Sequence, residues 1–66
     1  MQTHETPLEM AERHVREGAE RIARQRALID RMAERGQLSD EAQLFLDQLQ
    51  AAQREHTAHL DRLRGE

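Results

Sequence analysis

The sequence predicts an all-α fold, namely an antiparallel hairpin of two helices that cover about residues 7–35 and 40–64. In both segments apolar or small residues recur at steps of three and four, which is the spacing of one face of an α-helix. A short glycine-containing turn separates the segments, and a short loop between long helices makes them antiparallel neighbours. We therefore expect one helical-hairpin domain over residues 1–66, with residues 1–5 as a disordered tail.

The first helix is expected to begin at the stretch Thr6-Pro7-Leu8-Glu9. The Thr6 hydroxyl can accept a hydrogen bond as the N-cap, and Pro7 suits the first helical position because no amide hydrogen is needed there. Glu9 can reach back to the Thr6 backbone and so complete a capping box. The apolar pattern then continues without proline to Gly36, a residue typical of helix C-termini.

The second helix is expected to begin at Ser39 or Asp40, directly after the turn over residues 36–40. Asp40 with Gln43 offers a further capping box, and an acid at this position suits the positive end of the helix dipole. The apolar pattern of this helix ends near Gly65, which predicts its C-terminus there.

The two apolar stripes form a predicted seam, in which facing positions follow from a turn centred near residues 37–38. This alignment places Gly18 opposite His56, where the missing side chain leaves room for an imidazole. It places Gln25 opposite Leu49, where one buried polar residue would fix the register of the helices at some cost in stability. The predicted seam residues are Leu8, Val15, Gly18, Ile22, Gln25, Ile29, Met32, Ala42, Leu46, Leu49, His56, Leu60 and Leu63.

A hairpin of this size has a thin core, because each helix contacts the other along only one face. Further apolar residues lie off the main seam near the loop, and these are Leu28, Leu44, Phe45 and Ala51. We expect them to form an oligomer interface, at which two chains pair into an antiparallel four-helix bundle. The alternative is that they are singly exposed apolar residues, which are common on protein surfaces.

Three histidines are the candidate metal ligands, since His56 and His59 lie one turn apart and His14 falls near His59 in the alignment. Such imidazoles could bind zinc, copper or nickel. The alternative of seam histidines is favoured, because known bundle sites use Glu-x-x-His pairs and no inward carboxylate accompanies these residues. No metal or other cofactor is therefore expected. A neutral, buried His56 would instead make stability fall between about pH 7 and pH 5.

Charge is abundant and nearly balanced, with 10 arginines, 13 acids and a formal net charge of −3. Arginines scatter around the outer face of the first helix, which raises the alternative of a regulator that binds RNA or DNA phosphates. Acids interleave with them and the net charge is negative, so a solvated face explains the pattern better than a nucleic-acid partner. The expected ion pairs at i and i+4 are Glu9–Arg13, Glu12–Arg16, Glu17–Arg21 and Glu20–Arg24.

Catalytic groups are scarce, because the sequence contains no cysteine, no lysine and no glycine-rich phosphate loop. No stretch is apolar enough to span a bilayer, and the start MQTHETPLEM lacks the pattern of a signal peptide. We therefore expect a non-enzymatic, cytoplasmic protein without membrane association. Its expected function is that of a small interaction or regulatory module, which forms a homodimer and binds a protein partner.

The stretches His14-Val15-Arg16-Glu17-Gly18, Arg21-Ile22-Ala23-Arg24-Gln25-Arg26 and Leu28-Ile29 resemble a group of short uncharacterised proteins from alphaproteobacteria. Those proteins similarly carry a His-Val-x-x-Gly start, an Ile-Ala-Arg-Gln-Arg centre, a glycine turn, and a Leu-rich second helix with histidines near its end. The resemblance covers about residues 10–63 and departs at residues 51–53, which match no motif. It implies a hairpin fold and no particular activity. In form alone, the hairpin also resembles the small plasmid copy-control dimer that binds RNA loops.

Overall fold

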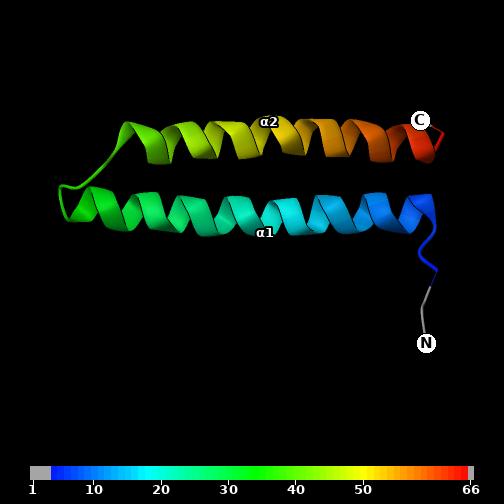
Figure 1. The fold of residues 1–66 in the computed structure, drawn as a ribbon, viewed down its shortest axis with the longest axis horizontal. Helices are drawn as coiled ribbons and strands as arrows, with labels where there is room; N and C mark the ends of the chain where they lie inside the picture. The colour runs from blue at the N-terminus through cyan, green and yellow to red at the C-terminus, as the bar shows by residue number, and fades with distance from the viewer. Residues whose placement is uncertain (1–3, 66) are drawn as a thin grey trace.

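The computed structural model describes residues 4–65, and within them the chain forms two helices joined by one turn. Helix α1 spans Pro7–Glu34 and helix α2 spans Asp40–Leu63. The helices run side by side in opposite directions, so that the start of α1 and the end of α2 lie away from the loop (Figure 1). The predicted two-helix hairpin is confirmed, and each predicted helix boundary agrees within one residue. Residues 1–3 of the predicted tail lie outside the described residues.

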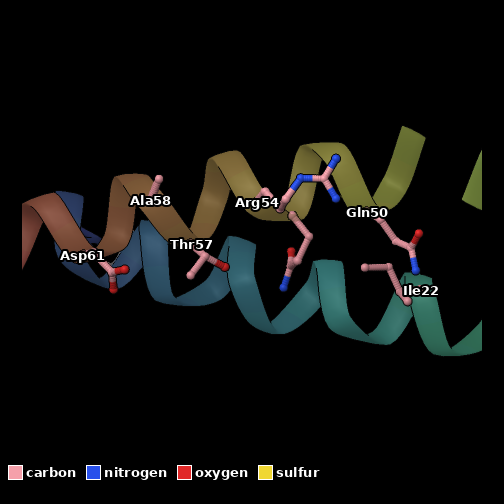
Figure 2. A pocket seen from close by; sticks show the side chains of 7 residues that line it. Ile22, Gln50, Arg54, Thr57, Ala58 and Asp61 are labelled. Atoms are coloured by element: carbon pink, nitrogen blue, oxygen red, sulfur yellow. The ribbon is translucent and has the colours of Figure 1, made fainter. Parts of the chain in front are cut away.

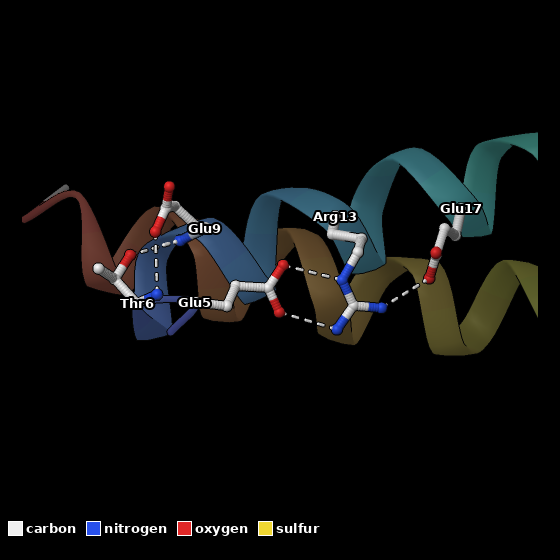
Figure 3. A network of polar contacts seen from close by, with 5 residues as sticks. All are labelled: Glu5, Thr6, Glu9, Arg13 and Glu17. Carbon is white, nitrogen blue, oxygen red and sulfur yellow. Dashed lines mark hydrogen bonds and ion pairs between the residues drawn. The ribbon is translucent and has the colours of Figure 1, made fainter. Parts of the chain in front are cut away.

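The start of α1 shows the predicted capping box (Figure 3). The Oγ1 atom of Thr6 accepts a hydrogen bond from the Glu9 amide at 3.0 Å, and Glu9 Oε1 accepts one from the Thr6 amide at 2.9 Å. Pro7 follows at the first helical position, as expected. Two amides that the helix itself cannot satisfy are therefore paired at this end.

The turn between the helices depends on Gly36, whose φ of +67° lies in the left-handed region that glycine adopts without strain. The Gly36 amide donates to Ala33 O at 3.1 Å, and the next amide, of Gln37, donates to Met32 O at 2.7 Å. These bonds satisfy carbonyls at the end of α1. Ser39 is then the N-cap of α2, with its Oγ accepting from the Ala42 amide at 3.1 Å.

The core between the helices is thin, as the size of the chain predicts. Among the described residues, the buried apolar side chains are Ala11, Leu46 and Leu60. Gly18 and Gln25 complete the buried positions. The predicted seam residues Leu8 and Leu63, at the ends of the stripe, are exposed. The other predicted seam residues are half-buried, and these are Val15, Ile22, Ile29, Met32, Ala42, Leu49 and His56.

The predicted pairing of Gly18 with His56 is wrong. Gly18 faces Gln53, whose amide carbon lies 2.9 Å from the position that a Cβ on Gly18 would take. His56 instead lies against His14, with ring centroids 5.4 Å apart. The alignment counted positions from the middle of the turn and treated every residue as facing its partner directly. It did not include the reach of a long glutamine side chain, which fills the space that Gly18 leaves.

Two glutamine amides connect the helices in opposite directions. Gln25 Nε2 on α1 donates to Ala42 O on α2 at 2.9 Å, and Gln53 Nε2 on α2 donates to Val15 O on α1 at 2.8 Å. A side-chain amide that is removed from water needs such a partner, because an unpaired buried polar group is costly. Gln25 is therefore a polar residue within the seam, as predicted. Its amide donates to the backbone of Ala42, a contact that the predicted position opposite Leu49 did not include.

Candidate functional site

An open groove near the loop is the clearest candidate for a functional surface. Its apolar lining comes from Leu28 on α1 and from Phe45 and Leu49 on α2, and Gln25 also lines it. Leu28 is 40% exposed and Phe45 is 50% exposed, so two large apolar side chains face solvent side by side. We call this feature the Phe45 groove. Exposed apolar residues that gather in this way indicate an interaction site more strongly than single ones do.

Two further exposed apolar residues lie in line with the Phe45 groove, toward the other end of the hairpin. Met10 precedes Leu28 by 18 residues, and Phe45 precedes Leu63 by the same number. Because this separation is about five full helical turns, each pair lies in line along one side of its helix. Met10 is 42% exposed and Leu63 is 39% exposed. We call the side of the hairpin that carries these four residues the groove face.

The expected ion pairs on the outside of α1 are largely wrong in the described part of the chain. Arg13 binds Glu5 through two hydrogen bonds of 2.9 Å and Glu17 through one of 3.2 Å (Figure 3). Glu12 pairs with Arg64 at 3.3 Å. The reason is visible at Glu9, whose carboxylate is already engaged in the capping box and therefore does not pair with Arg13.

The ion pair between Glu5 and Arg13 also shifts the pKa of each of the two side chains. The hydrogen bond from Arg13 lowers the pKa of Glu5, and the bond to Glu5 raises the pKa of Arg13, because each bond stabilises the charged forms. Glu5 had been assigned to a disordered tail, and it is instead held against α1 by these bonds.

Three arginines of α1 form one rim of the Phe45 groove, and these are Arg21, Arg24 and Arg31. Within residues 4–65, none of these three arginines lies within ion-pair distance of a carboxylate. Helix α1 as a whole is neutral, with six carboxylates and six arginines, whereas α2 holds five carboxylates and two arginines. The hairpin thus places arginines along one side of a neutral helix, beside a helix of net negative charge.

The four predicted interface residues do not lie together. Leu28 and Phe45 share the Phe45 groove, whereas Leu44 and Ala51 do not line it. Leu44 is 56% exposed, and its helical position next to Phe45 turns it toward the outside of α2. Leu49 and Leu63 were predicted as seam residues, and Leu49 also lines the groove. The residue of this face that the prediction did not name is Met10, which a search for apolar residues separated by whole numbers of turns would have found.

The histidines are brought together in part. His14 and His56 are half-buried neighbours on different helices, with their rings tilted by 47°, whereas His59 is exposed. Within the part of the chain that the structure describes, no group of three or more histidine, cysteine, aspartate or glutamate side chains converges as a metal site. Of the three predicted metal ligands, His14 and His56 lie side by side, and they belong to different helices.

A second groove, of about 580 Å³, lies along the other side of the seam (Figure 2). Ile22 and Ala58 are its only apolar residues, and the polar residues that complete its lining are Gln50, Gln53, Arg54, Thr57 and Asp61. The Gln53 Oε1 atom is buried here without a hydrogen-bond partner and lies against Gly18.

No protein-family model, curated protein or solved structure matches the chain. Neither of the helices described above combines the length and the apolarity that crossing a bilayer requires. Function is therefore inferred from the surface of the hairpin itself.

Proposed function

We propose that this chain is a non-enzymatic interaction module that works as a homodimer. Two hairpins pair through their groove faces into a four-helix bundle, and the outer surface of the bundle binds a protein partner. The observation that carries the proposal is the exposure of four large apolar side chains on the groove face, with Leu28 and Phe45 together in the groove and Met10 and Leu63 toward the other end.

The single chain exposes more surface than a compact protein of its mass, which is compatible with burial in a dimer. The chain of 7.7 kDa exposes 5241 Å². A compact folded monomer of this mass exposes only about 4300 Å², which leaves an excess of roughly 900 Å². A stable interface buries about 800 Å² on each partner. The radius of gyration of 15.2 Å agrees with this comparison, because a compact chain of this length has about 11 Å.

Charge complementarity favours a second copy as the occupant of the groove face. In a symmetric dimer the same face is used twice. When the two-fold axis runs parallel to the helices, α1 of each copy lies over α2 of its partner, and all neighbouring helices are antiparallel. The rim of Arg21, Arg24 and Arg31 then faces a helix with five carboxylates, among them Glu41, one turn before Phe45.

The partner-binding surface would lie outside the bundle. Leu38 in the turn and Leu44 on α2 are 58% and 56% exposed, and neither lines the Phe45 groove. Dimerisation through the groove face leaves both side chains in solvent at the loop end. These two leucines are therefore the residues that we assign to contact with a protein partner.

Analytical ultracentrifugation of three chains tests the dimer. The native chain should sediment at twice its 7.7 kDa mass at micromolar concentration. Phe45→Arg should weaken association on the order of a hundredfold or more, because each dimer loses two central aromatic contacts and gains two charges. Leu44→Arg is the matched control, since it introduces the same charge at the neighbouring exposed leucine, and it should remain dimeric. A monomeric native chain, or equal effects of the two substitutions, contradicts the proposal.

A further inference from the structure

The rings of the histidine pair are separated by the distance that a two-imidazole chelate requires. The ring centroids of His14 and His56 lie 5.4 Å apart and the rings are tilted by 47°. Two imidazoles that bind one metal ion at about 2.1 Å with a tetrahedral angle have ring centres roughly 5 Å apart. The two side chains are thus already separated by the distance that a shared ion would impose, without a change in helix positions.

We propose that His14 and His56 together bind one divalent cation of the nickel, copper or zinc class. Neutral imidazole is the ligand that these ions prefer, whereas Mg²⁺ and Ca²⁺ prefer oxygen ligands. Two protein ligands leave further coordination positions of the ion open to water. Because one histidine comes from α1 and the other from α2, the ion ties the helices together in the half of the hairpin away from the loop.

Within the described part of the chain, the half of the hairpin in which the pair lies has two other polar connections between the helices, and one is the bond of 2.8 Å from Gln53 Nε2 to Val15 O. The other is the ion pair that joins Arg64 to Glu12 at 3.3 Å, and both of its side chains are well exposed. Exposed pairs of this kind contribute little to stability. An ion that binds the folded hairpin and not the unfolded chain would stabilise the fold through a third connection in this half.

His59 provides an internal control, because it offers a competing pair within a single helix. It follows His56 by three residues on α2 and is exposed. A chelate of His56 with His59 would need no contribution from α1 and would be unaffected by the loss of His14. The proposed chelate requires His14 and is unaffected by the loss of His59.

Thermal unfolding at neutral pH with NiCl2 as the probe, followed by circular dichroism, separates these cases. At a free Ni²⁺ concentration ten times the dissociation constant, the unfolding equilibrium constant of the native chain should fall about elevenfold. His14→Gln and His56→Gln should each abolish the rise in melting temperature, His59→Gln should retain it, and MgCl2 should cause none. Absence of any rise with Ni²⁺, or a rise that persists in His14→Gln, overturns the proposal.

Both ligands of the chelate come from one hairpin, but His56 lies about three turns after Phe45 on the groove face, so binding is measured in the presence and in the absence of the dimer. Titration calorimetry should therefore give one Ni²⁺ per chain, both for the native chain and for Phe45→Arg. If Phe45→Arg does not fold, the stoichiometry of the native chain and the comparison of His14→Gln with His59→Gln still decide the question. Binding of Ni²⁺ to a chain that sediments as a monomer would support the chelate and contradict only the dimer.

Discussion

Replacing Gly18 with alanine should leave the stability of the native chain nearly unchanged, although alanine is the better helix former. Alanine in place of glycine stabilises a helix interior by about 1 kcal/mol. The new Cβ, however, would lie 2.9 Å from Gln53 Cδ and closer still to Oε1, so the amide has to leave the seam. Its bond of 2.8 Å to Val15 O is then lost, which costs about 1 kcal/mol.

The two contributions separate when the amide is removed first. In a Gln53→Ala background the added methyl group meets no amide, and Gly18→Ala should stabilise the fold by the full 1 kcal/mol or so of helix propensity. The expected coupling between the two positions is therefore about 1 kcal/mol. A difference of this size shifts the melting temperature of a small domain by about 4–8 °C.

The assay is thermal or urea unfolding of four chains, namely the native chain, each single variant and the double variant. All are compared at one protein concentration, because self-association shifts apparent stability. Effects that add to within about 0.5 kcal/mol would refute the reasoning, since independent sites behave in that way. A clear stabilisation by Gly18→Ala alone would likewise show that the Gln53 amide does not occupy the space beside Gly18.

Two further predictions concern polar groups of the hairpin. Gln25 is only 9% exposed, and its side-chain amide donates to Ala42 O at 2.9 Å. Gln25→Leu should raise the free energy of unfolding by about 1 kcal/mol, because the apolar surface that leucine buries outweighs the lost hydrogen bond. A lower urea midpoint in Gln25→Leu would contradict this prediction. Faster amide hydrogen exchange in α2 of this variant would show that the two helices are less firmly aligned. The hydrogen bond from Arg13 lowers the pKa of Glu5 below its usual 4.5, so the folded chain binds fewer protons there than the unfolded chain. The ion pair therefore stabilises the fold above pH 4.5, and this stabilisation is lost as the pH falls through the lowered pKa of Glu5. In Glu5→Gln, the melting temperature should no longer fall with pH over this acidic range.

The helices could be predicted from the sequence because local signals agree with one another. Thr6, Pro7 and Glu9 fix the start of α1, Gly36 ends it and Ser39 starts α2, each through contacts within a few residues. Local signals of this kind do not depend on how the helices pack. The boundaries consequently agree with the structure within one residue.

The contacts between helices were predicted less well, because they depend on where flexible side chains reach. His56 was predicted to face Gly18, and the amide of Gln53 in fact lies beside Gly18 and extends to the backbone of Val15. Glu9 was assigned both to the capping box and to an ion pair with Arg13, and one carboxylate satisfies only the first. A count of hydrogen-bonding capacity for each polar residue would have exposed this double assignment.

The two crossed glutamine bonds have a consequence for how the hairpin tolerates sequence change. Both acceptors, Val15 O and Ala42 O, are backbone carbonyls, and every amino acid supplies such a group. Substitution at position 15 or 42 changes the volume in the seam and leaves the acceptor in place. Gln25 and Gln53 are thus the two positions whose identity holds the alignment, while the residues they bind are free to drift during evolution.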